Sequence, residues 1–136
     1  MAYEIDYSGW PLVRVRTDGR LSTDGAHIAV SAFEALLARR QPFAVAYDAG
    51  DEGAVATDAD PIVWSWIAER RAELDAYCVG WASHLPNDRR RAVAEQHYSR
   101  GAGDTGGENA MPIRAFATWP ETEAWAGEQI RDPARR

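Results

Sequence analysis

The chain contains no lysine, because all 15 of its basic residues are arginine. This absence excludes Schiff-base catalysis, a pyridoxal-phosphate lysine and the lysine of a phosphate-binding P-loop. Basic charge is also scarce, since 21 carboxylates give the 136 residues a net charge of −6. A nucleic-acid binder normally carries a basic face, so the composition argues against nucleic acid as a partner.

Cysteine and long apolar runs are equally scarce. The single cysteine, Cys78, has no partner for an internal disulfide and lies in an apolar run, which indicates a reducing cytoplasm. No apolar stretch approaches the ~18 residues of a membrane span. The opening MAYEIDYSGW is acidic and amphipathic, so it does not resemble a signal peptide. We therefore expect a cytoplasmic protein with no membrane partner.

Motifs for metals and cofactors are missing or misplaced. The three histidines never stand at i, i+4 around a glutamate, so no zinc motif exists. GAGDTG, residues 101–106, matches the dinucleotide fingerprint in letters, but a predicted helix precedes it and a predicted strand follows. Pyrophosphate binding needs the opposite order. The sequence predicts a flexible connector there and no cofactor.

Apolar periodicity predicts a single α/β domain over residues 1–132, with a frayed tail at 133–136. A hairpin (3–9 and 12–17) precedes alternating helices and strands in the order β-β-α-β-α-β-α-β-α. Ser22 begins a helix to about Arg40, and Asp60-Pro61 predicts an N-cap and a helix to about Asp75. The remaining predicted elements are strands at 43–47, 76–83 and 112–117 and helices at about 88–100, capped by Asn87, and from a Thr118/Glu121 capping box to about 131.

The segment YDAGDEGAVATDADP, residues 47–61, is the most unusual stretch. It holds five carboxylates and no basic residue, between a buried strand and a capped helix. Its register does not fit a calcium loop, because Gly50 and Ala59 stand where ligands belong. We predict no metal site. A solvated acidic connector is the main interpretation, and a loose Mg²⁺ site is the weaker alternative.

A second candidate site lies where two predicted parallel strands end. Asp48 follows one strand and His84 the next, and ligands of open α/β sheets gather at that edge. We expect these two side chains to share one rim with Thr57, Asp58 and Trp119. A His–Asp pair suits general acid/base chemistry, although a solvated turn histidine is the plainer interpretation.

Two further features point to a binding surface. Arg89 opens a run of three arginines in the first turn of a predicted helix, where cations oppose the helix dipole and call for an acidic partner. Salt-bridged surface arginines are the simpler explanation. Trp64 lies off the apolar face of its predicted helix, beside the acidic segment. An exposed tryptophan there suits a partner surface or a ligand pocket, while rim packing is the alternative.

Several local sequences resemble the bacterial SpoIIAA-like/STAS-like family of anti-sigma-factor antagonists. They are the opening YEIDYSGWPLVRVRTDG, the strand FAVAYDAG, the strand-turn VGWASHLPN and the closing IRAFATWPETEAWAGEQI. The resemblance implies a mixed sheet flanked by helices and a non-enzymatic switch that binds protein partners. The family's phosphorylated turn corresponds to Thr57-Asp58-Ala59-Asp60, where Thr57 is the only hydroxyl and the characteristic glycine is absent. Asp58 resembles a permanently charged version of that switch.

The sequence thus predicts a non-catalytic regulatory or interaction domain of the STAS-like type. Its protein partner, or a second copy in a homodimer, is expected to contact one surface, formed by Asp48, Thr57, Asp58, Asp60, Trp64, Arg89 and Trp119. The alternative is a small-molecule-binding protein or enzyme with a Trp-lined pocket for an apolar ligand. In that case Asp48 and His84 are the acid/base pair.

Overall fold

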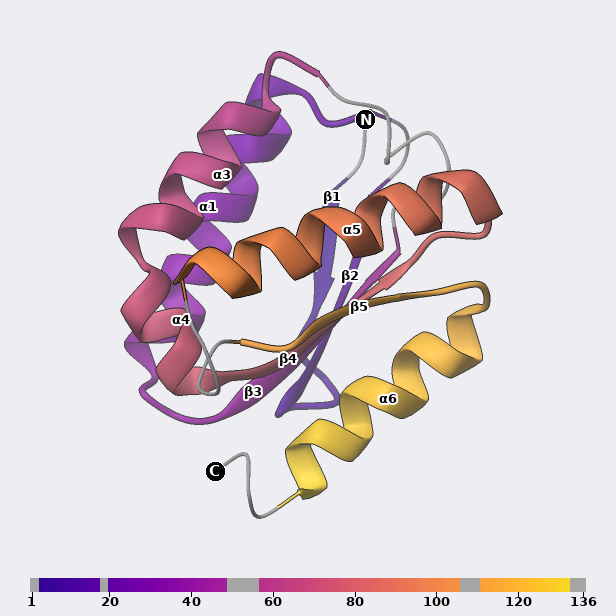
Figure 1. The fold of residues 1–136 in the computed structure, drawn as a ribbon. Coiled ribbons are helices and arrows are strands. Elements are labelled where there is room, and N and C mark those ends of the chain that lie inside the picture. The colour runs from indigo at the N-terminus through magenta and orange to yellow at the C-terminus, as the bar shows by residue number, and fades with distance from the viewer. Residues whose placement is uncertain (1–2, 18–19, 49–56, 106–110, 133–136) are drawn as a thin grey trace.

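A computed structural model describes residues 3–17, 20–48, 57–105 and 111–132. In these ranges the chain folds as an α/β protein with one mixed sheet, as predicted (Figure 1). The strands are β1 (Tyr3–Asp6), β2 (Leu12–Thr17), β3 (Phe43–Asp48), β4 (Cys78–His84) and β5 (Ile113–Phe116). The helices are α1 (Thr23–Ala38), α3 (Asp60–Glu69), α4 (Arg71–Tyr77), α5 (Asp88–Thr105) and α6 (Trp119–Arg131).

The strands lie in the order of the sequence, β1-β2-β3-β4-β5. β1 pairs antiparallel with β2 through the predicted hairpin, and the other three pairs are parallel. Each parallel connection advances the sheet by one strand in the same direction. Because such crossovers are right-handed, their helices belong on one side of the sheet, and only α6 is left for the opposite face.

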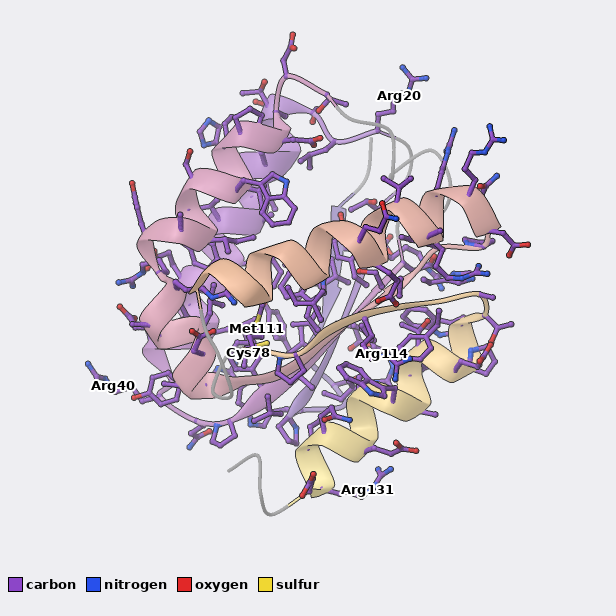
Figure 2. All side chains as sticks on the ribbon, viewed as in Figure 1. Arg20, Arg40, Cys78, Met111, Arg114 and Arg131 are labelled. Carbon is purple, nitrogen blue, oxygen red and sulfur yellow. The ribbon has the colours of Figure 1, made fainter. Side chains whose placement is uncertain are left out.

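The first face of the sheet carries the larger core. Val13 and Val15 of β2 alternate inward with Phe43 and Val45 of β3, and they pack against the apolar side of α1. Ala29, Phe33, Leu36 and Leu37 of α1 are buried, as the 3.6-residue period predicts. Cys78 and Met111 lie inside the molecule near the start of β4 and β5 (Figure 2).

The second face is built from small residues and is covered by α6. Ala44 and Ala46 of β3 and Ala82 of β4 are fully buried against Ala126 of α6. Gly80 allows the closest approach, because a Cβ there would lie 2.8 Å from Cγ of Gln129. Trp119 and Trp125 of α6 flank this contact. The small side chains on β3 and β4 therefore allow α6 to pack closely against the sheet.

Several predicted boundaries are wrong in the structure. The helix expected over 60–75 breaks at Arg70 into α3 and α4, and α4 includes Tyr77, so β4 begins two residues later than predicted. α5 continues to Thr105 and takes in the first five residues of GAGDTG, which was predicted to be a loop. Asp60 is the first residue of α3 rather than its N-cap. Apolar periodicity marks none of these ends.

The predicted caps elsewhere are present. The Ser22 hydroxyl accepts the amide of Gly25, the Asn87 side chain accepts the amide of Arg90, and the Thr118 hydroxyl accepts the amide of Glu121. Among the described residues, no helix has the length and apolar character needed to cross a membrane.

Two glycine substitutions test the close approach of α6. Gly80→Ala forces its new methyl group against Gln129 and Trp125, so we expect it to lower the free energy of unfolding by about 1–3 kcal/mol. The control is Gly127→Ala in α6, whose added Cβ meets only the flexible tip of Arg131. That change removes a helical glycine and should raise stability by about 0.5–1 kcal/mol. Urea unfolding measures both, and equal stability of wild type and Gly80→Ala would contradict the packing described.

Candidate functional site

Asp48 and His84 meet at the carboxyl end of the parallel strands, as predicted. They are the last residues of β3 and β4, and the register places them side by side. Nδ1 of His84 lies 3.0 Å from Oδ1 of Asp48. Both side chains are mostly buried, with exposed fractions of 18% for His84 and 22% for Asp48. The pair comes from residues 36 positions apart, and the parallel pairing of β3 with β4 brings it together.

Arg16 and Trp119 are two described neighbours of this pair. Arg16 lies directly beside Asp48 in the β2–β3 register, and its Nε is 3.6 Å from Oδ2 of Asp48. The Trp119 ring meets the His84 ring edge-on, with centroids 6.3 Å apart. Trp119 is the first residue of α6, so the N-terminus of this helix lies next to His84. One carboxylate therefore holds an arginine on one oxygen and a histidine on the other.

The chemistry of the pair follows from its hydrogen bond. An ionised carboxylate can only accept, so Nδ1 of His84 carries the proton that it donates to Asp48. The second ring nitrogen, Nε2, then has its lone pair available in neutral imidazole. A fixed tautomer of this kind is the arrangement that general bases use. In the described part of the chain, no nucleophile lies in hydrogen-bond contact with His84.

The turn before α3 forms a second, separate site. The Thr57 hydroxyl donates to the carbonyl of Leu21 at 2.8 Å and accepts the amide of Ala59 at 3.2 Å. Oδ2 of Asp60 accepts the amide of Thr57 at 3.1 Å. Asp58 lies between them with its side chain exposed. One hydrogen bond thus ties the turn to Leu21, just before α1, and the only hydroxyl of the turn is engaged both as donor and as acceptor.

These two sites lie toward opposite faces of the sheet, and the expectation that they share one rim stays a prediction. Asp48, His84 and Trp119 belong to the α6 face of the sheet, whereas the Thr57 turn leads into α3 on the other face. Asp60 instead lies near Tyr47, whose ring stacks on Trp81 within the larger core. Burial raises the pKa of the Tyr47 hydroxyl, a hydrogen bond with Thr17 opposes that rise, and the charge of Asp60 adds to it. Alternation along β3 sends Tyr47 and Asp48 to opposite faces.

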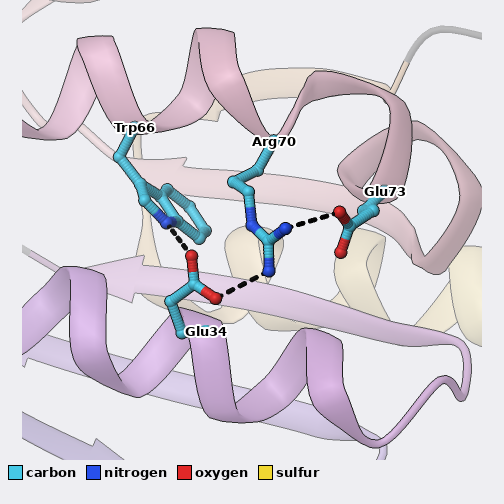
Figure 3. A network of polar contacts seen from close by, with 4 residues as sticks. All are labelled: Glu34, Trp66, Arg70 and Glu73. Atoms are coloured by element: carbon cyan, nitrogen blue, oxygen red, sulfur yellow. Dashed lines mark hydrogen bonds and ion pairs between the residues drawn. The ribbon is translucent and has the colours of Figure 1, made fainter.

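A polar network fixes α3 and α4 on α1 (Figure 3). The Glu34 carboxylate of α1 accepts the indole N–H of Trp66 at 2.6 Å on one oxygen and a guanidinium N–H of Arg70 at 2.7 Å on the other. Arg70 also donates to Glu73 at 2.6 Å. Arg70 stands at the break between α3 and α4, so the network holds this joint. The hydrogen bond from Trp66, with that from Arg70, lowers the pKa of Glu34.

The other predicted surface residues have mixed outcomes. Trp64 is 46% exposed on α3, as its position off the apolar face predicts. Arg89 is exposed in the first turn of α5, and Arg91 is compensated by Asp88 and by the carbonyls of Leu85 and Pro86. Residues 49–56 of the acidic segment lie outside the described residues.

The structure supports little metal or thiol chemistry in the parts it describes. No group of three or more His, Cys, Asp or Glu side chains in those ranges is arranged to hold a metal ion. Cys78 is buried, and burial raises the pKa of its thiol to about 12. It therefore stays protonated and behaves as a small core residue.

Sequence reasoning missed Arg16, Glu34 and Arg70. Arg16 had a signal, because it alternates with Val13 and Val15 and so lies on the face opposite the larger core, where Asp48 also lies. Glu34 and Arg70 had none, since each is an ordinary polar residue on an amphipathic helix. Their pairing depends on how α1 and α3 cross.

Comparison of the chain with models of protein families, with curated proteins and with solved structures found no match.

The Glu34 network predicts a pH dependence of stability. The pKa of Glu34 is lowered in the folded state from an ordinary value of about 4.5. Its contribution is therefore present above that value and is lost as the pH falls through the folded pKa. We expect Glu34→Gln to be less stable than wild type at pH 7, with the difference shrinking toward pH 3. Urea unfolding across this range measures it, and exposed Glu128→Gln is the control. A difference independent of pH would contradict the network.

Proposed function

We propose that this chain is a non-catalytic interaction domain of the STAS-like type that works in a reducing compartment such as the cytoplasm. Its protein partner binds at the turn from Thr57 to Asp60 and along the start of α3. The proposal rests mainly on one observation, which is that the Thr57 hydroxyl is engaged in both directions while the neighbouring Asp58 is exposed.

Two physical arguments make this turn a constitutive surface rather than a phosphorylation switch. A phosphate on Thr57 would remove its donated hydrogen bond to Leu21, and Asp58 and Asp60 would repel the added charge. Asp58 already supplies a negative charge near the N-terminus of α3, where the helix dipole favours it. No hydrogen bond or ion pair involves Asp58 among the described residues, so its charge is available to a basic partner.

Trp64 supplies the apolar part of the same surface. It lies one turn into α3 from Asp60 and is 46% exposed. Partner surfaces commonly combine one large aromatic side chain with charges at the rim. The Glu34 network holds α3 in place, so this surface is presented by a fixed helix.

A charge reversal tests this proposal. Affinity capture from a lysate of the source organism, followed by quantitative mass spectrometry, is compared for wild type, Asp58→Arg, Trp64→Ala and Thr57→Val. We expect a partner retained by wild type and Thr57→Val and reduced by about tenfold or more with Asp58→Arg or Trp64→Ala. Glu128→Arg on α6 is the matched control. Partner binding that survives Asp58→Arg, or that requires a phosphate on Thr57, would contradict the proposal.

The Asp48–His84 pair favours a second candidate function, which is acid/base chemistry on a small ligand at the carboxyl edge of the sheet. The observation that favours it is the 3.0 Å contact that fixes the His84 tautomer. In this reading His84 exchanges a proton through Nε2, Asp48 orients it, and Trp119 provides an apolar wall.

Spectroscopy and turnover together test the second candidate. We expect nitrogen NMR to detect the proton of neutral His84 on Nδ1 in wild type, and Asp48→Asn to change that tautomer. In a screen of small substrates, any activity should fall by about 100-fold or more in His84→Gln. Turnover that is unchanged in both variants would remove these roles, whereas activity lost only in His84→Gln would leave Asp48 without a positioning role.

A further inference from the structure

The outer edge of β5 is closed by a side chain instead of by a neighbouring strand. The carbonyl of Pro112 accepts the amide of Trp81 in β4, and that of Phe116 accepts the amide of Leu85 just after β4. Backbone groups alternate in direction along a strand, so those of Ile113 and Ala115 point away from β4. The outward amide of Ala115 donates to Oε1 of Glu95 at 2.9 Å. Glu95 belongs to α5, which crosses in front of this edge (Figure 1).

The described side chains of α5 anchor it weakly. None of residues 88–96 is buried, and Val93 is 61% exposed. Within residues 88–96, Glu95 accepts the Ala115 amide of β5, and Arg91 donates to the carbonyls of Leu85 and Pro86. Segments that bury little apolar surface open locally at low cost in free energy. Residues 88–96 of α5 therefore protect the β5 edge while burying little apolar surface of their own.

We propose that α5 guards the β5 edge and that, when α5 opens, this edge pairs with the β1 edge of a second copy of the chain. β1 is the other outer strand of the sheet, and both strands are four residues long. Because β1 runs antiparallel to the other strands, the new pair would be antiparallel and would continue the sheet from one copy to the next.

The charges and the apolar side chains on the two strands favour β1 of a second copy as the strand that pairs with β5. The lateral register places Asp6 in one row with Arg14, Ala46, Ala82 and Arg114, so Asp6 and Arg114 project from the same face. Glu4 lies on that face too, because it is two residues before Asp6 in β1. Figure 2 shows Arg114 beside α6, on this side of the sheet. Pairing would therefore set the exposed Arg114 of one copy against Glu4 or Asp6 of the next.

The opposite face is also complementary. Ile5 of β1 lies in one row with Val15, Tyr47, Ser83 and Ala115. In the proposed pair, Ile5 of one copy would pack near Ile113 and Ala115 of the other, which gives an apolar contact on the side of the larger core. A pairing of β5 with β5 would bring two copies of Arg114 onto one face, so charge disfavours it.

The geometry explains why a guard is needed. A contact between two different edges is heterologous, and it leaves a free β1 at one end and a free β5 at the other. Such contacts continue without limit unless an edge is covered. Glu95 satisfies the edge amide and so keeps the protein from open-ended association. This inference does not depend on the partner surface at α3 or on the Asp48–His84 pair.

The test compares Glu95→Ala with Glu95→Gln by sedimentation velocity over a concentration series. Glutamine keeps an acceptor for the Ala115 amide, so we expect Glu95→Gln to remain at the 15.0 kDa monomer like wild type. Glu95→Ala should show a weight-average mass that rises with concentration by about twofold or more. Adding Arg114→Glu to Glu95→Ala should abolish that rise, while Arg114→Lys should keep it.

Hydrogen exchange reports whether the Ala115 amide is still protected, and circular dichroism shows whether each variant is folded. The Ala115 amide should be protected from exchange in wild type and Glu95→Gln and should lose protection in Glu95→Ala, with a native spectrum in all three. A natively folded Glu95→Ala that stays monomeric would overturn the proposal, as would equal association of Glu95→Gln. Association that is unchanged by Arg114→Glu would overturn β1 of a second copy as the occupant.

Discussion

The close contact between α6 and the sheet is the constraint on which the rest of this structure depends. Every parallel connection advances the sheet in the same direction, so among the described helices α6 covers the second face by itself. It can do so because Gly80, Ala44, Ala46 and Ala82 present little more than backbone to it. The position of α6 then fixes where Trp119 begins the helix, and thereby what surrounds His84.

The two candidate sites follow from the two faces of this sheet. Asp48 and Tyr47 are neighbours in sequence, yet alternation along β3 sends the carboxylate toward the start of α6 and the phenol into the larger core. The Asp48–His84 pair is therefore a polar site at the carboxyl edge of the sheet, beside Arg16. The Thr57 turn has a carboxylate surface on a helix that the Glu34 network holds in place.

Several arginine charges are paired within the described part of the molecule. Arg14 pairs with Glu123, Arg16 with Asp48, Arg70 with Glu34 and Glu73, and Arg71 with Asp75. Pairs that are this exposed add little to stability individually. Their larger effect is on the charge of the surface. The paired arginines are neutralised, so the excess carboxylates determine which partners the protein attracts. An acidic surface such as that of Asp58 favours a basic partner.

The sequence by itself determined the α/β class, the hairpin, the caps at Ser22, Asn87 and Thr118, and the meeting of Asp48 with His84. Each of these follows from local rules: hydrophobic period, capping chemistry, and the shared edge of parallel strands. Only the tertiary structure decided that the Thr57 turn and the Asp48 edge lie on different faces, that the helix after Asp60 breaks at Arg70, and that Glu95 closes the edge of β5. Those features depend on how the helices cross and on which strand is outermost. The residues in such contacts are far apart in the sequence and follow no repeat that the sequence shows.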